Sequence, residues 1–336
     1  MRIGIIGTNW GRMHVGGFRG AGAEVVGVCG KDEGHTLEVA RAEGIPLATT
    51  RVMELCAAAD VVVVASPDAL HVPHASEALN AGRHVLVEKP LAPRVEDAQA
   101  LAAWARTLAP GQVAAINFPY RFLPPLSALK AWLASRSPPR ALDVTVANSF
   151  LPEDDGNREG PLEGPTGDFG GASHVLDTAL WLLGGEPEWV SAVLNGRPAH
   201  GLSLQARMDS GALLTVTHRP SRTPGIHGRW SLRGHGWEVD FDGGYVPALN
   251  GWRIGPARAV VGDAGQEVGP RVEPHPGQRE PWAQAHVETA RALMERIRGG
   301  EARNLATLDD GARVQRLLDA AARSEREGRR VPFGGR

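Results

Sequence analysis

Residues 83–91 of the chain read Arg-His-Val-Leu-Val-Glu-Lys-Pro-Leu, and this stretch decides how the N-terminal half is expected to fold. The apolar run from His84 to Val87 predicts a short buried strand that stops at a charged pair and a proline. Proline disfavours helical backbone in the residue before it, so Lys89 is expected in an extended kink at the edge of a sheet. A lysine in an isolated Glu-Lys pair is commonly a solvated loop residue, so its role depends on the rest of this half.

Strands and helices alternate through the N-terminal half. Short apolar or β-branched runs predict strands at Ile3–Ile6, Val25–Cys29, Asp60–Ala65, Val85–Val87 and Gln112–Ile116. Helical spacing fills the stretches between several of them, as at Leu70–Asn80 and Val95–Thr107. This alternation indicates a parallel, doubly wound sheet with right-handed crossovers.

Ligands of such a sheet bind beyond the carboxyl ends of its strands. Gly7, Gly30, Ser66, Glu88–Lys89 and Asn117 all fall at predicted strand ends, so we expect them along one edge. Lysine occurs only three times in the chain, whereas arginine supplies the other cations. A titratable ammonium at a ligand edge favours a catalytic role for Lys89 over that of a solvated loop residue.

The turn after the first strand contains Gly7, Thr8, Asn9, Trp10, Gly11 and Arg12. A strand, a glycine-bearing turn and a helix form the first unit of a dinucleotide-binding fold, in which backbone N–H groups meet the pyrophosphate. Asn9 takes the place of the middle glycine, and Asn tolerates positive φ better than other residues with a side chain. Taken alone, the turn also fits an ordinary strand-to-helix connection. Together with the other strand ends, it predicts cofactor contacts for residues 7–12.

The end of the second strand bears on the choice between NADP and NAD. NAD enzymes usually place Asp or Glu there to bind the ribose 2′-OH, whereas Gly30 and Lys31 follow this strand. A small residue and a cation would accept a 2′-phosphate, so NADP is the preferred cofactor and NAD the alternative. In that alternative, Lys31 begins a solvated helix and Asp32 binds the ribose.

Length and composition narrow the class of protein. A chain of 336 residues suggests two domains, and a formal net charge of -2 predicts neither a nucleic acid nor a membrane partner. The two cysteines, Cys29 and Cys56, lie in apolar segments and form no disulfide or metal framework. The first residues enter a strand without signal-peptide features, and no apolar run approaches the roughly 20 residues of a membrane span. We therefore expect a cytoplasmic protein.

The pattern changes in the C-terminal half. After a helix at Leu126–Leu133, strands are predicted at Ala141–Ser149, Trp189–Leu194, Leu202–Met208, Leu213–His218, Gly228–Leu232 and Trp237–Phe241. Successive strands after one helix indicate a mostly antiparallel open sheet with helices on one face. Gly, Pro and charge predict loops at Leu151–Gly170 and Gly251–Gln278, and amphipathic helices are predicted at Ala283–Arg298 and Leu308–Arg326.

Helical spacing over Ala172–Leu183 places His174 and Asp177 in a first turn. A histidine near a helix start is ordinarily a cap or surface residue. Other histidines lie on or beside separate strands without ligand spacing, so no metal site is predicted.

Several motifs together resemble the Gfo/Idh/MocA family of NAD(P)-dependent oxidoreductases. They are GTNWG at 7–11, SPDALH at 66–71, AGRHVLVEKPL at 81–91, RF at 121–122, GGASHVLD at 170–177 and AAARS at 320–324. The resemblance implies a Rossmann domain, residues 1–119, and a substrate-binding and oligomerisation α/β domain, residues 120–336. It implies that Lys89 and His174 are catalytic, and that Ser66, Pro67, His71, Glu88 and Asn117 contact the cofactor.

Two departures from the family pattern matter. The family places an Asp four residues before the histidine, where this chain has Gly170; Asp168 could replace it only if the backbone bulges there. The acidic residue after the second strand is also missing, as Gly30 shows. The first departure concerns the chemistry on the substrate, and the second concerns only the cofactor.

These observations predict a dehydrogenase that transfers a hydride between nicotinamide and a sugar, polyol or related small hydroxy compound. Lys89 would contact the reacting oxygen, His174 would accept or relay the proton, and Tyr120, Arg121 and Asp168 could bind substrate. The main alternative is a cofactor-binding sensor that has lost catalysis. A third, an amino-acid-type reductase, fits the Rossmann half but not residues 81–91. An exposed sheet face is expected to be covered in a homodimer or homotetramer.

Overall fold

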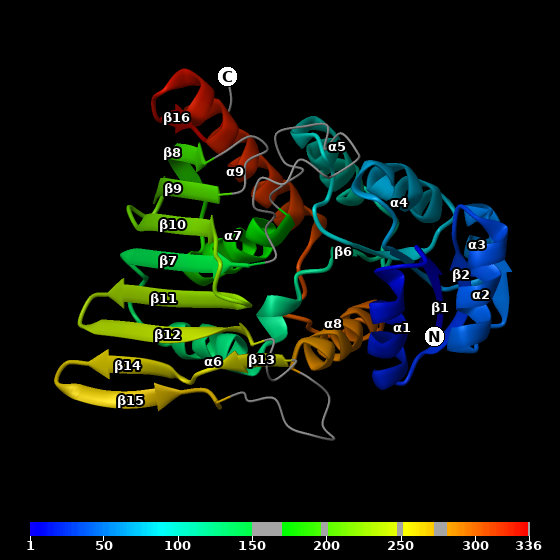
Figure 1. The fold of residues 1–336 in the computed structure, drawn as a ribbon, viewed down its shortest axis with the longest axis horizontal. Coiled ribbons are helices and arrows are strands. Elements are labelled where there is room, and N and C mark those ends of the chain that lie inside the picture. The colour runs from blue at the N-terminus through cyan, green and yellow to red at the C-terminus, as the bar shows by residue number, and fades with distance from the viewer. Residues whose placement is uncertain (150–169, 196–200, 247–250, 272–280, 335–336) are drawn as a thin grey trace. The chain divides into compact units, whose positions relative to one another are not determined.

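The computed structural model describes residues 1–149, 170–195, 201–246, 251–271 and 281–334 (Figure 1). The chain forms two compact units. Unit 1 comprises Met1–Phe122 and Ala283–Gln315, and unit 2 comprises Leu123–Trp282 and Arg316–Arg336. The division differs from the expected boundary after residue 119, because residues 283–315 return to the first unit.

Unit 1 is built on a six-stranded sheet in which every strand is parallel to its neighbours. The order is β3-β2-β1-β4-β5-β6. The strands are β1 (Arg2–Ile6), β2 (Glu24–Cys29), β3 (Leu47–Thr49), β4 (Val61–Val64), β5 (His84–Val87) and β6 (Ala114–Ile116). This confirms the predicted doubly wound sheet. The sequence did not predict β3, which is only three residues long.

Helices connect these strands. They are α1 (Gly11–Gly20), α2 (Glu33–Glu43), α3 (Val52–Ala58), α4 (His71–Asn80) and α5 (Val95–Ala105), with 3-10 turns η1 (Asp68–Leu70) and η2 (Pro119–Phe122). The ends of α2 show how local sequence sets the boundaries. The Asp32 carboxylate accepts a hydrogen bond from the His35 N–H at 2.7 Å, and Gly44 ends the helix at φ 61°.

The core of unit 1 explains why residues 283–315 belong to it. All four valines of β4 are fully buried, as expected for a central parallel strand covered on both faces. Ala290 and Leu293, on α8 (Pro281–Ile297), lie in the same apolar cluster as Ile5 and Phe18. Deleting this helix would therefore expose part of the first unit's core.

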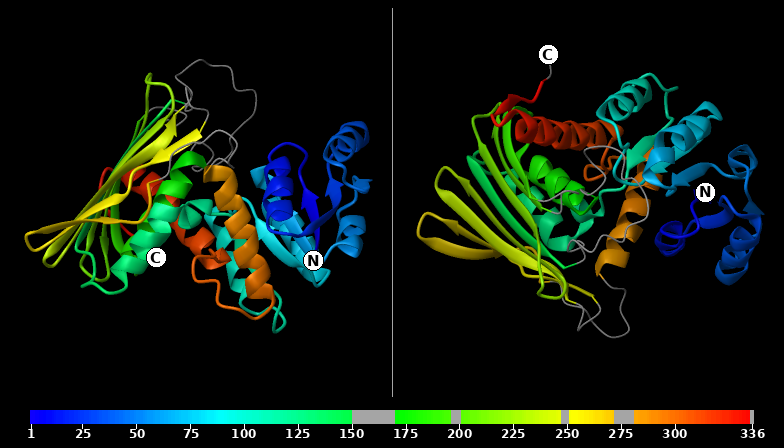
Figure 2. Two further views of the ribbon diagram at one scale, coloured as in Figure 1. Left: turned by 90° about the horizontal axis from the view of Figure 1, so that it is seen from below. Right: turned by 45° about the horizontal axis from the view of Figure 1, so that its top comes forward.

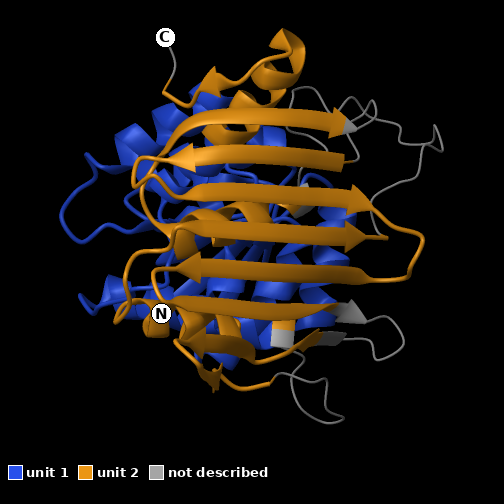
Figure 3. Ribbon diagram, turned by 90° about the vertical axis from the view of Figure 1, so that its left-hand side faces the viewer, with its two compact units in different colours: residues 1–122, 283–315 blue, residues 123–282, 316–336 orange. Residues whose placement is uncertain are grey.

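Unit 2 contains a ten-stranded sheet, seen face on in Figure 3. Its order is β15-β14-β12-β11-β7-β10-β9-β8-β16, and β13 also pairs with β12. Among the strands that the structure describes, only β7 and β10 pair in parallel, which confirms the predicted, mostly antiparallel sheet. The strands are β7 (Ala141–Asn148), β8 (Pro187–Asn195), β9 (Gly201–Met208), β10 (Leu213–Pro220), β11 (Ile226–Gly234), β12 (Trp237–Val246), β13 (Gly251–Ile254), β14 (Ala257–Val261), β15 (Ala264–Val268) and β16 (Val331–Pro332).

The prediction of a loop over Gly251–Gln278 is wrong for its described part, because β13, β14 and β15 lie there. Glycine and charge suggested a loop, but β14 and β15 form a hairpin whose turn contains Gly262 at φ 59°. Such turns require glycine, so the residues that looked like loop markers are the turn of a hairpin. The predicted loop at 151–170 lies outside the described residues up to position 169.

Helices pack on one face of this sheet (Figure 2). They include α6 (Pro124–Leu133) and α7 (Gly170–Leu183), and α9 (Leu308–Glu327) runs from unit 1 into unit 2. Along β9, the buried Leu204, Ala206 and Met208 alternate with exposed Ser203 and Gln205. One face of the sheet is therefore apolar and packed, and the other is polar. None of the described helices is both long and apolar enough to cross a membrane.

Candidate active site

The carboxyl ends of five strands in unit 1 form one continuous edge. The last residues of these strands are in register, pairing Ile6 with Cys29 and Val64, Val64 with Val87, and Val87 with Ile116. The residues that follow are therefore neighbours: Gly7, Gly30, Ala65, Glu88 and Asn117. The Glu88 N–H donates to Val64 O and the Asn117 N–H to Val87 O, each at 2.8 Å. The sheet thus brings together strand ends that lie far apart in the sequence.

The turn after β1 is shaped by glycine. Gly7 has φ 121°, and a Cβ at this position would lie 2.2 Å from Ala65 O. A Cβ on Gly11 would lie 2.8 Å from Ile5 Cγ2. The turn after β1 therefore lies too close to the end of β4 to leave room for a side chain at Gly7. This is expected where a backbone closely approaches a phosphate. Trp10 is 47% exposed at the start of α1.

The first residue after β2 is also closely packed. A Cβ on Gly30 would lie 2.3 Å from Thr36 Oγ1, so a carboxylate-bearing residue could not replace it without rearrangement. One carboxylate oxygen of Asp32 already accepts the hydrogen bond that caps α2. The side chain of Lys31 is exposed. The Arg12 Nε donates to Glu43 Oε1 at 2.7 Å.

Glu88 is the centre of a buried polar cluster. Its Oε1 accepts from Asn117 Nδ2 at 2.6 Å and lies 2.7 Å from His14 Nε2, and its Oε2 accepts from the Lys89 N–H at 3.1 Å. Burial raises the pKa of Glu88, but the hydrogen bond with His14 and the nearby cationic groups outweigh it and hold the pKa well below its usual range. Glu88 is thus a carboxylate that accepts hydrogen bonds and fixes the backbone at Lys89.

Lys89 is half-buried and follows this carboxylate directly. Burial raises the pKa of the neighbouring Asp68, an effect that the charges of His71 and Lys89 oppose. The strand register puts Lys89 at the carboxyl edge, where it was predicted to lie. Its catalytic role stays a prediction.

His71 joins two loops of this edge. Its Nδ1 lies 2.7 Å from Pro90 O and its Nε2 lies 2.8 Å from Ser66 O. Since both ring nitrogens face protein carbonyls and the residue is 1% exposed, His71 ties the loop after β4 to the loop after β5. Ser66 and Pro67 are more exposed. Contacts between these three residues and the cofactor stay predictions.

Arg121 lies in η2, shortly after Asn117. Its Nη2 is 3.1 Å from Asp310 Oδ1, and the Arg121 side chain is only 4% exposed. Burial raises the pKa of Asp310, but Arg121 and the Thr307 N–H outweigh it and hold the pKa below its usual range. This ion pair connects η2 to the start of α9, so Arg121 has a structural partner. A contact between Arg121 and the substrate stays a prediction. Burial also raises the pKa of the half-buried Tyr120.

His174 lies in unit 2, on α7. It is 7% exposed, and its ring meets the Trp282 ring edge-on at a centroid distance of 5.5 Å. Asp177, one turn along the helix, is fully buried. Asp168 lies outside the described residues. Lys89 and His174 belong to different units, and their predicted meeting at one substrate stays a prediction. Over the described ranges, no three His, Cys, Asp or Glu side chains are grouped to hold a metal ion.

Two residues of the polar cluster were not predicted from sequence. His14 is on α1 and 2% exposed, and His286 is on α8 and 3% exposed. Their rings meet edge-on with centroids 5.6 Å apart. His14 shares the inward face of its helix with Val15 and Phe18, so helical spacing could have shown its burial. Nothing in the sequence links His286 to a site that lies some 170 positions earlier in the chain.

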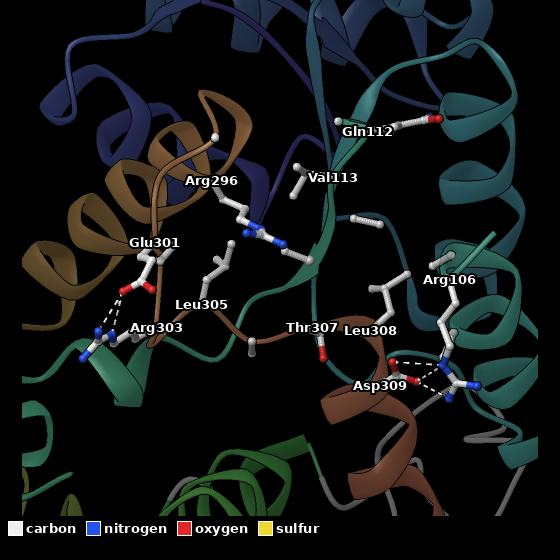
Figure 4. A pocket seen from close by; sticks show the side chains of 18 residues that line it. Arg106, Gln112, Val113, Arg296, Glu301, Arg303, Leu305, Thr307, Leu308 and Asp309 are labelled. Carbon is white, nitrogen blue, oxygen red and sulfur yellow. Dashed lines mark hydrogen bonds and ion pairs between the residues drawn. The ribbon is translucent and has the colours of Figure 1, made fainter. Parts of the chain in front are cut away.

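A hollow of about 810 Å³ lies elsewhere in unit 1 (Figure 4). It begins at the amino end of β6, the end remote from Asn117. Figure 4 shows Arg296 reaching into it from α8, with the ion pairs Arg106–Asp309 and Glu301–Arg303 at either side. Ligands of doubly wound sheets bind at the carboxyl ends, so this hollow is not the expected cofactor site.

Residues 1–110 match the family model described as "Oxidoreductase family, NAD-binding Rossmann fold" for the Gfo/Idh/MocA proteins. Residues 1–110 therefore belong to the Gfo/Idh/MocA family. The resemblance inferred from residues 7–11, 66–71 and 81–91 is thereby confirmed.

Curated relatives extend this family match. YceM of Salmonella typhimurium is 38% identical over 140 residues, covering 42% of each chain. The scyllo-inositol 2-dehydrogenase (NADP(+)) IolW of Bacillus subtilis is 24% identical over 298 residues, covering 82% of this chain and 79% of the relative. Against the first three matching relatives, the chain spans only 42%, 30% and 53% of their lengths.

A solved structure of levoglucosan dehydrogenase in complex with NADH shares the whole fold. The TM-score is 0.84, with 100% of both chains covered and 18% sequence identity. At this identity the likeness shows the fold of this chain and nothing finer.

The residues of the carboxyl edge fit a dinucleotide. A Cβ at Gly7 would clash with Ala65 O, so this turn has room only for glycine. A bare backbone of this kind lets a pyrophosphate approach closely. Asn117 is 1% exposed, and its Oδ1 is buried with no hydrogen-bond donor among the described residues. A buried acceptor left open at a ligand edge is the kind of group that a bound cofactor completes.

Proposed function

We propose that this Gfo/Idh/MocA protein is a dehydrogenase that moves a hydride between NADP and the hydroxyl or carbonyl carbon of a small sugar-like compound. Sugars, polyols and related hydroxy compounds form the substrate class. The observation that carries the proposal is the strand register, which sets Gly7, Gly30, Glu88 and Asn117 along one edge beside Lys89. The names of the inositol and levoglucosan dehydrogenases support this substrate class.

The bound nicotinamide would supply the hydride acceptor, and this chain's residues would manage the proton and the charge. An alcohol that loses hydride must also lose its hydroxyl proton. Lys89 would contact the reacting oxygen, where an ammonium stabilises developing negative charge. His174 would accept or relay the proton, without the carboxylate that relatives place where this chain has Gly170. That difference is expected to slow turnover or to change the proton path.

The preference for NADP is supported by the region after β2. Lys31 is exposed there, Gly30 carries no carboxylate, and the Asp32 side chain already caps α2. A 2′-phosphate would gain a charge-assisted contact with Lys31. A ribose 2′-OH would lack the acidic partner that NAD enzymes usually provide.

The test is a turnover assay of the full chain with NADP⁺ or NADPH against a panel of sugars, inositols and their keto forms. Lys89→Ala should keep cofactor affinity but lower turnover by roughly 10²–10³-fold, the usual cost of removing a group that stabilises charge developing on an oxygen. Lys89→Arg keeps the positive charge, but its larger planar guanidinium cannot take the position of the compact ammonium, so it should also be slow. Arg41→Ala, an exposed change on α2, is the control. Unchanged turnover in Lys89→Ala would refute the assignment.

A sensor without catalysis is the second candidate. Gly170, in place of the family's Asp before His174, is the observation that favours it. A sensor should bind NADPH tightly, oxidise it with no member of a broad carbonyl panel, and bind a dedicated protein partner. Turnover of any member that depends on Lys89 would exclude this candidate.

A further inference from the structure

The Asn117 amide lies between two acceptors in unit 1. Its Nδ2 is 2.6 Å from Glu88 Oε1 and 3.3 Å from His286 Nε2. An ionised carboxylate can only accept hydrogen bonds, so the amide must turn its NH₂ toward Glu88. The second N–H then faces His286 Nε2, which accepts as the unprotonated nitrogen of the ring.

This arrangement fixes where the other end of the amide points. With both N–H groups engaged, Oδ1 faces away from Glu88 and His286. It is buried, and it meets no donor in the part of the chain that the structure describes. Rotating the amide by half a turn would bring Oδ1 against the Glu88 carboxylate, and two acceptors would then face each other. The orientation of the open oxygen is therefore set by the cluster.

The cluster is held firmly by the fold. Glu88 also accepts from the Lys89 N–H and lies 2.7 Å from His14 Nε2, so its position is fixed from several directions. His286 is carried by α8, which packs closely on α1: a Cβ on Gly17 would lie 3.3 Å from the His286 Cβ. Each of the four cluster side chains is at most 4% exposed. Asn117 is therefore held in place, and a cofactor can reach its buried Oδ1 only when the groups that cover this oxygen move aside.

We infer that Asn117 Oδ1 is the acceptor for the carboxamide NH₂ of the nicotinamide, and that Glu88 and His286 are positioning residues that hold the amide for it. This deepens the proposed function and rests on it. The open oxygen needs a neutral N–H donor, and the carboxamide is the part of the nicotinamide that carries one. A hydrogen bond from the carboxamide to Asn117 would fix the rotation of the nicotinamide about its glycosidic bond. It would therefore determine which face of the ring meets the substrate.

The experiment compares the binding of NADP⁺ with that of its 3-acetylpyridine analogue, in which a methyl group replaces the carboxamide NH₂. Isothermal titration calorimetry of the full chain gives both affinities without any turnover. The wild type should bind NADP⁺ about tenfold more tightly, because the analogue leaves a buried acceptor without a donor. Equal affinities in the wild type would overturn the inference without any variant.

Two pairs of variants locate the effect. Asn117→Leu keeps the shape of the side chain without its acceptor, and should reduce the affinity ratio to about one. His286→Leu removes one of the two restraints on the amide and should lower the ratio. His286→Gln should retain it, because the Gln oxygen can accept the same N–H. His235→Leu, an exposed change in unit 2, is the matched control.

The outcomes separate the two proposals. If the wild type binds neither compound, the proposed function fails. If it discriminates between them and Asn117→Leu does so equally, the function stands and this inference is overturned. If His286→Leu matches the wild type, His286 is not a positioning residue and that part of the inference is overturned. Circular dichroism spectra that match the wild type exclude misfolding as the cause of a changed ratio.

Discussion

Two regions of unit 1 receive adjacent aspartates from the start of α9, and they differ in how they treat charge. Asp310 meets Arg121 beside the carboxyl edge, where the arginine side chain is 4% exposed. Asp309 meets Arg106 at the rim of the hollow, where the arginine side chain is 66% exposed. The hollow is the more open space, yet the buried ion pair lies beside the carboxyl edge. The edge where the cofactor is expected is therefore distinguished by buried, paired charge and not by the size of a cavity.

The two ion pairs give the largest expected contrast. Arg121→Met should lower the free energy of unfolding by about 3 kcal/mol, the low end of the cost of breaking a buried pair, because Asp310 keeps Arg313 and Thr307 as partners. Arg106→Met should lower it much less, because solvent screens this exposed pair. Urea denaturation of both variants at neutral pH measures the difference. Equal losses would mean that the two regions do not differ as the exposures indicate.

Glu88→Gln tests the carboxylate at the centre of the edge. The variant should lose about 2–3 kcal/mol at pH 7, because hydrogen bonds to a charged acceptor become bonds to a neutral one. The pKa of Glu88 is depressed in the folded protein, so its stabilisation is present above the unfolded value of about 4.3 and is lost as the pH falls. Stability of the wild type should therefore decline below about pH 5, and the variant should decline less steeply.

Urea midpoints between pH 3 and pH 7 would show this difference in slope. Glu38→Gln, an exposed change on α2, should follow the wild type. Parallel curves for Glu88→Gln and the wild type would show that Glu88 is not held as a carboxylate.

Lys31→Ala is expected to have the smallest effect of these variants. The change should be confined to the affinity for the cofactor. The affinity for NADPH should fall about tenfold, with that for NADH nearly unchanged, because only the 2′-phosphate contact is removed. Fluorescence titration with both cofactors measures the ratio. Arg41→Ala removes a cation from α2, the helix that follows Lys31, and should leave the ratio as it is. A parallel loss for NADH would contradict the assignment of Lys31 to the phosphate.

Local pattern was enough to predict most of unit 1 and its edge. Short apolar strands are bounded by turns, and parallel strands must end together, so Gly7, Glu88 and Asn117 could be placed side by side from spacing alone. His286 could not, because its contact depends on a chain segment that returns from far along the sequence. The hairpin within 251–268 was missed because its turn glycine was taken as a loop marker. The meeting of Lys89 with His174 rests on the family resemblance alone.

The return of residues 283–315 to the first unit has a consequence for recombination between relatives. Unit 2 cannot be exchanged by a single crossover, because residues 283–315, which complete unit 1, lie in the sequence between two parts of unit 2. A working chimaera needs three junctions, and the last falls inside α9, between Gln315 and Arg316. Both parents must then agree in helical phase at that point, or the spliced helix will present the wrong side chains to one of its cores.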